Sequence, residues 1–381
     1  MDQFRCLLPG GVAYGAGTVA GLEEKVSGRS VLLISGGGVV ASGIAGRVQE
    51  ICAACASSVR EYFDVPPEPS EDQVTEAVAA LSDVSVDVIV AVGGGSVMDM
   101  AKLAAVMING GPSMSDLFDN KLPGTRNSYL VMIPTTAGTG AEATPNAIVF
   151  RPKLNLKVGI VCDPFVPDWV ILDPELIADL PPAITASTGL DALCHALECY
   201  ISNKANPLSD MFALQASELI FKSLKRSFLD GSDIPARGDM LLAAFYAGIC
   251  IAASGTNIVH ALSYPLGGRY RIPHGVSNAI LLAPAFRANM DCSAEKMAVL
   301  ADLTGKSTEG MGVEEKAGLL VDSLAELSRE LGIPQTLGDL GVPAGDLDSI
   351  VDAAFEVKRL LNNNPKPLSK DDIRSVYRSI L

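Results

Sequence analysis

Short apolar runs alternate with amphipathic stretches through the first half of the chain. Ser30–Ser35 and Val88–Val92 are apolar runs that end at glycines, which is typical of parallel strands buried on both faces. A helical period follows over Val40–Ser57, a further strand is predicted at Val59–Phe63, and acidic residues open a helix near Ser70. This alternation predicts a doubly wound, mostly parallel sheet.

The apolar period changes near residue 180. From Pro181 onward, apolar residues recur at three- and four-residue spacing, which indicates helices. We therefore predict an α/β nucleotide-binding domain over residues 1–180 and an all-helical domain over residues 181–381. The active site is expected in the cleft between them.

Composition narrows the functional classes. The formal charge of −15 argues against binding to nucleic acid or to an anionic membrane, because both require a basic surface. No signal peptide and no uninterrupted apolar span of membrane length is visible. The eight cysteines are scattered, which favours reduced thiols and a cytoplasmic protein.

A glycine turn after the strand at Val88–Val92 is a candidate phosphate cradle. Gly94 and Gly95 allow the backbone to approach a ligand closely, and the first amides of the following helix suit a pyrophosphate. Ser96 is predicted to cap this helix, with Asp99 closing a capping box. The pattern is not the G-x-G-x-x-G fingerprint, so a tight turn without a ligand remains the alternative.

A second turn-rich segment, Pro134–Glu142, follows the strand predicted at Tyr129–Ile133. Its hydroxyls at Thr135, Thr136 and Thr139 could bind ribose or phosphate oxygens. Both loops follow the carboxyl ends of strands, where open α/β sheets bind ligands.

The three histidines of the chain all fall in the predicted helical domain. Asp191 and His195 are four residues apart, so they share one helix face, and His260 and His274 follow later. One carboxylate with three imidazoles can hold a divalent metal and leave a position for substrate. Taken singly, a histidine is more often a hydrogen-bonded structural residue, and spacing alone does not show that the last two reach the same point.

Several motifs together resemble the iron-containing (group III) alcohol dehydrogenases. The matching segments are Gly93–Lys102 (G-G-G-S-x-x-D-x-A-K), Pro134–Glu142 (P-T-T-A-G-T-G-S-E), Ile171–Leu176 (D-P-x-L), Gly189–His195 (G-x-D-A-x-x-H), His260–Leu262, Pro273–Gly275 and Asn364–Lys366 (N-P-R). They stand in the family's order and cover nearly the whole chain.

The resemblance implies a fold similar to that of dehydroquinate synthase and a homodimeric, metal-dependent, NAD(P)-linked alcohol dehydrogenase or aldehyde reductase. It implies Fe²⁺, with Zn²⁺ as the alternative, held by Asp191, His195, His260 and His274. Cofactor contacts are implied for Gly36, Gly37, Gly38, Gly94, Gly95, Ser96, Asp99, Thr135, Thr136, Thr139, Lys157 and Leu176. A pocket for a small alcohol or aldehyde is implied at Asn146, Ile251 and Leu360.

Three positions depart from the family pattern. Tyr264, the candidate catalytic residue, stands where many members have a histidine that helps to move a proton. A phenol can donate a hydrogen bond but is a poor base near neutral pH. Gly36 replaces the aspartate that binds the adenosine ribose in NAD-preferring members, which favours NADP. Glu68 replaces an asparagine that often precedes the equivalent of Pro69.

Other functions remain open on the same scaffold. One is a metal-independent maleylacetate-type reductase and another is a lyase similar to dehydroquinate synthase, although the full metal set and the loop with alanine, glycine and threonine disfavour both. A non-catalytic protein would bind nucleotide without turnover. Arg269 and Arg271, between two proposed ligands, could meet an anionic substrate group or be solvated surface residues.

Overall fold

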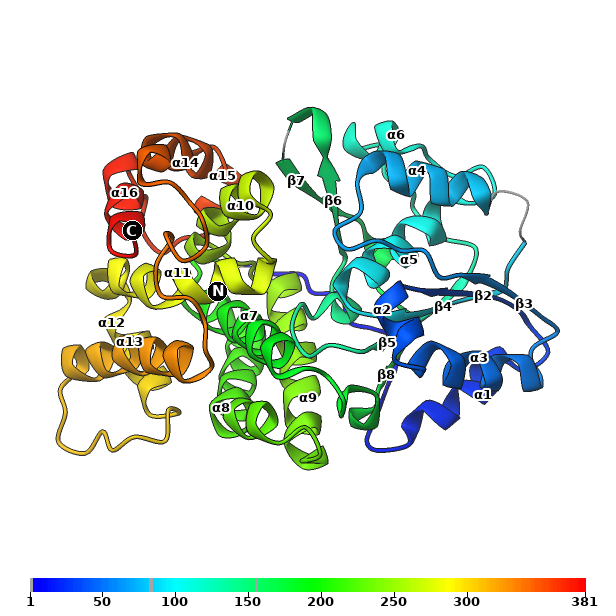
Figure 1. The fold of residues 1–381 in the computed structure, drawn as a ribbon, viewed down its shortest axis with the longest axis horizontal. Coiled ribbons are helices and arrows are strands. Elements are labelled where there is room, and N and C mark those ends of the chain that lie inside the picture. Colours follow the sequence, from blue (N-terminus) through cyan, green and yellow to red (C-terminus); the bar gives the residue numbers. More distant parts are fainter. Residues whose placement is uncertain (1–2, 82–84, 155) are drawn as a thin grey trace. The chain divides into compact units, whose positions relative to one another are not determined.

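The computed structural model describes residues 3–81, 85–154 and 156–381 (Figure 1). The chain forms two compact units. The α/β unit consists of Leu7–Thr136 and Gly140–Asp179. The helical unit consists of Leu180–Leu381, an N-terminal segment that ends at Cys6, and the short segment Ala137–Thr139. The chain thus enters the helical unit within the predicted Pro134–Glu142 loop and then returns.

The α/β unit is built on a six-stranded sheet in the order β1-β8-β5-β4-β2-β3. Every pair of neighbouring strands in this sheet is parallel. The strands are β1 (Val12–Tyr14), β2 (Ser30–Ser35), β3 (Ser58–Tyr62), β4 (Val88–Gly93), β5 (Tyr129–Pro134) and β8 (Trp169–Leu172). The predicted doubly wound, parallel fold class is confirmed.

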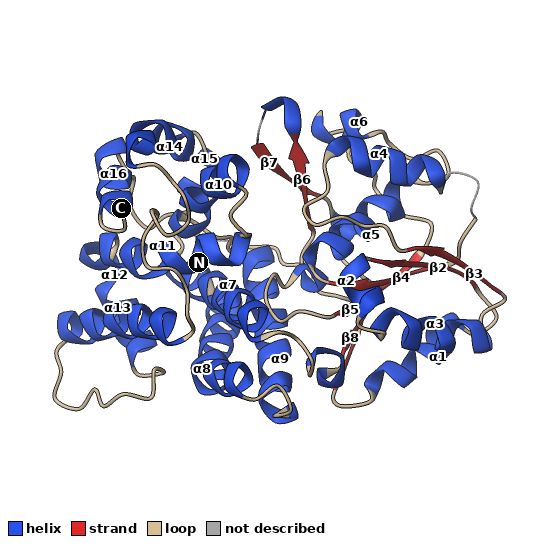
Figure 2. Ribbon diagram, viewed as in Figure 1, coloured by secondary structure: helices blue, strands red, loops and turns tan. Residues whose placement is uncertain are grey.

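Helices cover both faces of this sheet (Figure 2). Side chains alternate along each strand, so Leu32 and Ile34 of β2 pack with α4 and α5, whereas Val31 and Leu33 pack with α1 and α3. This two-sided burial explains why the strand sequences are continuously apolar. The helices are α1 (Glu23–Val26), α2 (Gly37–Ala41), α3 (Ile44–Cys55), α4 (Glu71–Ala80), α5 (Gly95–Met107) and α6 (Met114–Phe118).

Two local predictions for this unit need correction. The helix expected over Val40–Ser57 is broken into α2 and α3, because Gly43 adopts a left-handed conformation with φ of 80°. In addition, β6 (Asn146–Arg151) and β7 (Leu156–Val161) form an antiparallel hairpin that was not predicted. Short 3₁₀ turns occur at Thr18–Leu22, Ala141–Ala143, Pro152–Leu154, Asp163–Phe165 and Pro174–Ile177.

The helical unit contains no strand in its described residues (Figure 2). Its helices are α7 (Pro182–Ile201), α8 (Pro207–Leu229), α9 (Ile234–Ala253), α10 (Ile258–Tyr270), α11 (His274–Ala288), α12 (Met290–Ala301), α13 (Val313–Glu330), α14 (Leu347–Phe355), α15 (Lys358–Leu361) and α16 (Lys370–Arg378). Among the helices of the described chain, only α9 is long and apolar enough to cross a bilayer, and 67% of that stretch is buried, as in a core helix.

Candidate metal centre and cofactor site

Three helices of the helical unit supply the four predicted metal ligands. Asp191 and His195 lie one turn apart on α7, His260 lies in the first turn of α10, and His274 is the first residue of α11. A glycine next to His274 lets α11 approach α7 closely, since a Cβ on Gly275 would lie 2.4 Å from a backbone oxygen of α7.

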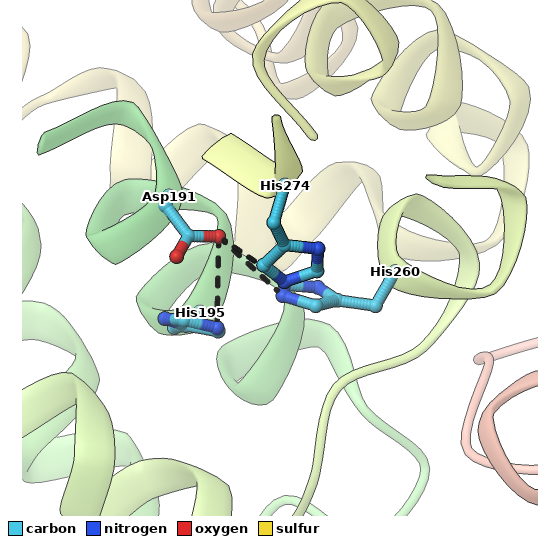
Figure 3. A group of neighbouring side chains, drawn as sticks. All are labelled: Asp191, His195, His260 and His274. Atoms are coloured by element: carbon cyan, nitrogen blue, oxygen red, sulfur yellow. Dashed lines mark ion pairs between the residues drawn. The ribbon is translucent and has the colours of Figure 1, made fainter. Parts of the chain in front are cut away.

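The four side chains converge on one point (Figure 3). Their potential ligand atoms all lie within 4.8 Å of one another. Asp191 Oδ1 is 3.8 Å from His195 Nε2, 3.7 Å from His260 Nε2 and 3.8 Å from His274 Nε2. Three of the four residues are buried and His274 is partly exposed, which leaves one open side.

Two further residues hold these ligands, and neither was given a role from the sequence. Glu198, on α7, accepts hydrogen bonds from the backbone amides of Asn257 and Val259 and contacts His260 Nδ1. Asn278, on α11, donates from Nδ2 to Asp191 Oδ1 at 2.6 Å, and the same atom lies 3.1 Å from His260 Nε2 and 3.2 Å from His274 Nε2, so it points among the ligand atoms. Glu198 follows His195 by three residues on an otherwise apolar helix face. An acidic residue at such a position was the one feature of the sequence that could have indicated its role.

The surroundings shift the pKa values of the cluster in different directions, lowering those of Asp191 and His195 and raising that of His260. Burial lowers the pKa of His195 to about 4, so its imidazole is neutral at physiological pH. Burial alone would raise the pKa of Asp191, but the neighbouring His195, His274 and His260, with a hydrogen bond from Asn278, lower it overall. Burial likewise opposes a charge on His260, yet the Glu198 carboxylate raises its pKa.

The donor set fits a divalent transition metal. One carboxylate oxygen and three imidazole nitrogens suit Fe²⁺ or Zn²⁺. Either metal binds only when these ligand atoms are not protonated. The His195 and His260 rings stack with centroids 4.6 Å apart, an arrangement that two protonated imidazoles would disfavour. The residues present therefore fit the metal that the sequence resemblance implies.

The predicted phosphate cradle lies at the carboxyl end of β4. Gly94, in extended conformation, is the residue that precedes α5, so the predicted N-cap at Ser96 is wrong. The predicted capping box is wrong as well, because the Asp99 carboxylate accepts a hydrogen bond from the Ile148 amide of β6. Ser96 Oγ instead accepts a hydrogen bond from the backbone amide of Glu68.

The second predicted loop begins directly beside this cradle. The Thr135 amide donates to the Gly93 carbonyl at 2.9 Å. A Cβ on Gly94 would lie 3.3 Å from Thr136 Oγ1, so glycine leaves room for the two loops to meet. Thr139 belongs to the segment that lies in the helical unit.

A buried charged cluster lies behind the cradle. Lys102 Nζ donates to the carbonyls of Ala141 and Asn146, each at 2.6 Å, and to Thr144 Oγ1. Burial lowers the pKa of Lys102 to about 8, raises that of Asp99 to about 6 and raises that of Glu142 to about 7. This cluster ties the helix that follows the glycine turn to the hairpin.

The remaining predicted cofactor residues of the α/β unit occupy separate places. Gly36 precedes α2, which contains Gly37 and Gly38 at its start. Lys157 of β7 forms an ion pair with Glu68 at 2.5 Å. Glu68 has a φ of 51°, a left-handed conformation that asparagine tolerates well, which agrees with the family preference at this position.

Leu176 is 2% exposed and packs in the core beneath the sheet. Asn146 belongs to the hairpin of the α/β unit, whereas Ile251 on α9 and Leu360 on α15 belong to the helical unit. Tyr264 lies one turn after His260 on α10, and its ring centroid is 6.4 Å from that of His274. Its position beside the cluster agrees with the predicted spacing.

Comparison with known proteins assigns the chain to a family. Residues 9–174 match the family described as "Iron-containing alcohol dehydrogenase", and residues 185–381 match "Fe-containing alcohol dehydrogenase family, C-terminal". The chain belongs to the iron-containing alcohol dehydrogenase family. The resemblance inferred from the motifs is confirmed.

Individual relatives of this iron-containing alcohol dehydrogenase share nearly its full length. Long-chain-alcohol dehydrogenase 1 of Geobacillus thermodenitrificans is 37% identical over 361 residues, which is 93% of this chain and 90% of the relative. A structure of 1,3-propanediol oxidoreductase has a TM-score of 0.93, 30% identity and full coverage of both chains. Sulfoacetaldehyde reductase from Bifidobacterium kashiwanohense, solved in complex with NAD⁺, has a TM-score of 0.88 and 28% identity, covering 100% of this chain and 99% of that one.

Proposed function

We propose that the protein is a metal-dependent, NAD(P)-linked alcohol dehydrogenase or aldehyde reductase acting on a small alcohol or aldehyde. The observation that supports this most strongly is the mostly buried cluster of potential metal ligands formed by Asp191, His195, His260 and His274. Four potential ligand atoms within 4.8 Å of one another are the arrangement that a single metal ion requires.

The residues of the helical unit would bind the metal and keep it in place. Asp191, His195, His260 and His274 would hold it, with Glu198 orienting His260. When bound, the cation supplies Lewis acidity to the substrate oxygen, and the nicotinamide ring supplies or accepts the hydride. Tyr264 can donate a hydrogen bond at the open side of the cluster.

The residues of the α/β unit would bind the dinucleotide. The first amides of α5, at Gly95 and Ser96, have no partner within the helix and suit a pyrophosphate. Thr135 and Thr136 add hydroxyls beside this turn. We propose a preference for NADP, because Gly36 presents no carboxylate that would repel a 2′-phosphate.

Metal analysis of anaerobically purified protein tests this function, followed by a panel of alcohols and aldehydes with both cofactors. We expect about one equivalent of iron or zinc per chain, and turnover that stops when a chelator removes the metal. Unchanged turnover without metal would instead support a maleylacetate-type reductase. Nucleotide binding without turnover of any substrate would support a non-catalytic protein.

His260→Ala separates the two halves of this proposal. Loss of one of four ligands should abolish metal binding and activity together, while nucleotide binding remains, because the cradle belongs to the other unit. The cytoplasmic location and the homodimer remain predictions, and fractionation and light scattering would test them.

A further inference from the structure

The loop Thr135–Ala141 connects the candidate cofactor site to the helix that carries two of the predicted metal ligands. Its middle, Ala137–Thr139, belongs to the helical unit, whereas the loop residues on either side belong to the α/β unit. Only three residues make this excursion, so the loop has little slack. A displacement of its ends is therefore transmitted to its middle.

Both ends of this loop are fixed to the elements that flank the glycine turn. At the first end, the Thr135 amide donates to the carbonyl of Gly93, the last residue of β4, at 2.9 Å. At the other end, Lys102 of α5 donates from Nζ to the Ala141 carbonyl at 2.6 Å. A pyrophosphate bound at the first amides of α5 would therefore act on both ends of the loop.

The middle of the loop packs directly on the backbone of α7. A Cβ on Gly138 would lie 2.7 Å from Thr188 Cβ and 2.9 Å from the Thr188 carbonyl oxygen, so this approach requires glycine. Thr188 precedes Asp191 by three residues and His195 by seven, which places all three on one face of α7. The loop thus rests on the face that carries two predicted ligands.

The same turn of α7 also supports the start of α11. A Cβ on Gly275 would lie 2.4 Å from the Ser187 carbonyl oxygen. Since Ser187 directly precedes Thr188, the loop and the start of α11 pack on adjacent residues. His274, the first residue of α11, therefore depends on the same turn. A shift of this turn would act on three of the four predicted ligands.

His195 is itself sensitive to the loop. Its Nδ1 atom is buried and has no hydrogen-bond partner among the described residues, although a metal-binding histidine usually donates its second ring N–H to an acceptor. Burial has the largest effect on the pKa of His195 and lowers it, and the Gly138 backbone is among the groups that raise it. This agrees with the packing of Gly138 along the same face of α7.

We propose that this loop couples the two binding sites, so that a dinucleotide pyrophosphate at the glycine turn and a divalent cation at the helical cluster each strengthen the binding of the other. Gly138 is the positioning residue, because its backbone transmits the position of the loop to α7. The first ligand orders the shared segment, and the second then binds to a segment already ordered. This inference rests on the proposed function and adds a linkage between its two sites.

Binding measurements without substrate test the proposal. ADP-ribose carries the pyrophosphate but no nicotinamide, so it probes the loop alone. Saturating ADP-ribose should lower the dissociation constant of Zn²⁺, measured by competition with a chelator, by about five- to a hundredfold. Zn²⁺ should lower the dissociation constant of ADP-ribose by the same factor, because such a linkage is reciprocal. AMP, which lacks the pyrophosphate, should change the Zn²⁺ affinity much less.

Gly138→Ala should bring this coupling factor close to one, because the added methyl group forces the loop away from α7. Gly318→Ala is the matched control and should keep the wild-type factor. Gly318 also lies in a helix of the helical unit, where a Cβ would meet nothing within 4 Å. Full coupling in Gly138→Ala would overturn the proposal, since direct attraction between the cation and the phosphates would then explain it.

The wild-type protein decides the question even if Gly138→Ala does not fold. Independent binding of ADP-ribose and Zn²⁺ would overturn the proposal. Coupling that appears with NADPH and not with ADP-ribose would overturn it as well, because it would then depend on the nicotinamide.

This outcome is separable from that of the proposed function. Coupled binding in a protein that turns over no alcohol or aldehyde would support the linkage and refute the proposed function. Metal-dependent turnover together with independent binding of Zn²⁺ and ADP-ribose would do the reverse.

Discussion

Glu198 contacts Nδ1 of His260 through a carboxylate that is completely buried, while Asp191 faces Nε2 of the same ring. The second Glu198 oxygen accepts hydrogen bonds from the amides of Asn257 and Val259, at 3.0 Å and 2.7 Å. The carboxylate therefore cannot turn away from the ring. A proton on Nδ1 leaves the lone pair of Nε2 directed at the candidate metal position.

Glu198→Gln should lower metal affinity by about ten- to a hundredfold, which is the usual effect of removing such a partner. The amide would lose the charge-assisted bond, and its NH₂ group would face either the backbone amides, which need an acceptor, or Nδ1 of His260, which would then have to give up its proton. Competition with a chelator measures this affinity directly. Glu142→Gln is the matched control, because it neutralises another buried carboxylate, in the other unit, and should not change metal affinity.

Asn278→Asp should make stability strongly dependent on metal. Asn278 Nδ2 lies 2.6 Å from Asp191 Oδ1, so a second carboxylate there would repel the first in a buried place. We expect the melting temperature of metal-free protein to fall by about 5 °C or more, and added zinc to restore it. Asn278→Ala, measured in the same calorimetric scans, should lose the hydrogen bond without this metal dependence. Equal melting of the Asp variant with and without metal would contradict the prediction.

Much of the α/β unit could be predicted because the apolar pattern of each strand lies within the strand's own segment of sequence. The apolar run Ser30–Ser35 coincides with β2, since a strand covered on both faces must be apolar throughout. The break at Gly43 was missed, because the helical period continues across it and one left-handed residue changes no apolar position. The β6–β7 hairpin was missed because its strands are only partly buried.

The candidate metal centre could be predicted only in part from local patterns. Asp191 and His195 share a helix face, which four-residue spacing reveals. Whether His260 and His274 lie next to Asp191 and His195 depends on how α10 and α11 pack against other helices. Only the family resemblance predicted that the four residues form one site. The role of Glu198 could not be predicted from local patterns either, because its partner His260 lies 62 residues away in sequence.

The buried charges behind the phosphate cradle predict an unusual pH dependence. Burial raises the pKa of Glu142 from 4.5 to about 7, and its Oε1 has no hydrogen-bond partner among the described residues. Between these two values the folded protein binds more protons than the unfolded chain. Glu142 therefore lowers the free energy of unfolding as pH rises through this window.

Glu142→Gln should remove this contribution. Denaturant unfolding gives the free energy of unfolding of the wild type and of the variant. The value for the wild type minus the value for the variant should decrease from pH 5 to pH 7.5. Asp99 adds a slope of the same sign at lower pH, since its pKa rises from 3.8 to about 6, and it is present in both proteins. A difference that does not vary with pH would mean that Glu142 stays ionised in the folded protein.

Gly36→Asp should shift the proposed cofactor preference for NADP towards NAD. Gly36 has φ of −123° and ψ of 158°, an extended conformation that aspartate adopts readily. Its Cβ would lie 3.1 Å from the Val65 carbonyl, so the Val65 backbone must move by a few tenths of an ångström. The new carboxylate would bind ribose hydroxyls and repel a 2′-phosphate, so the ratio of the NADP⁺ and NAD⁺ dissociation constants should rise at least about tenfold. Gly36→Asn has the same size without the charge and should change the ratio much less. Equal effects of the two variants would show that the 2′-phosphate does not bind beside Gly36.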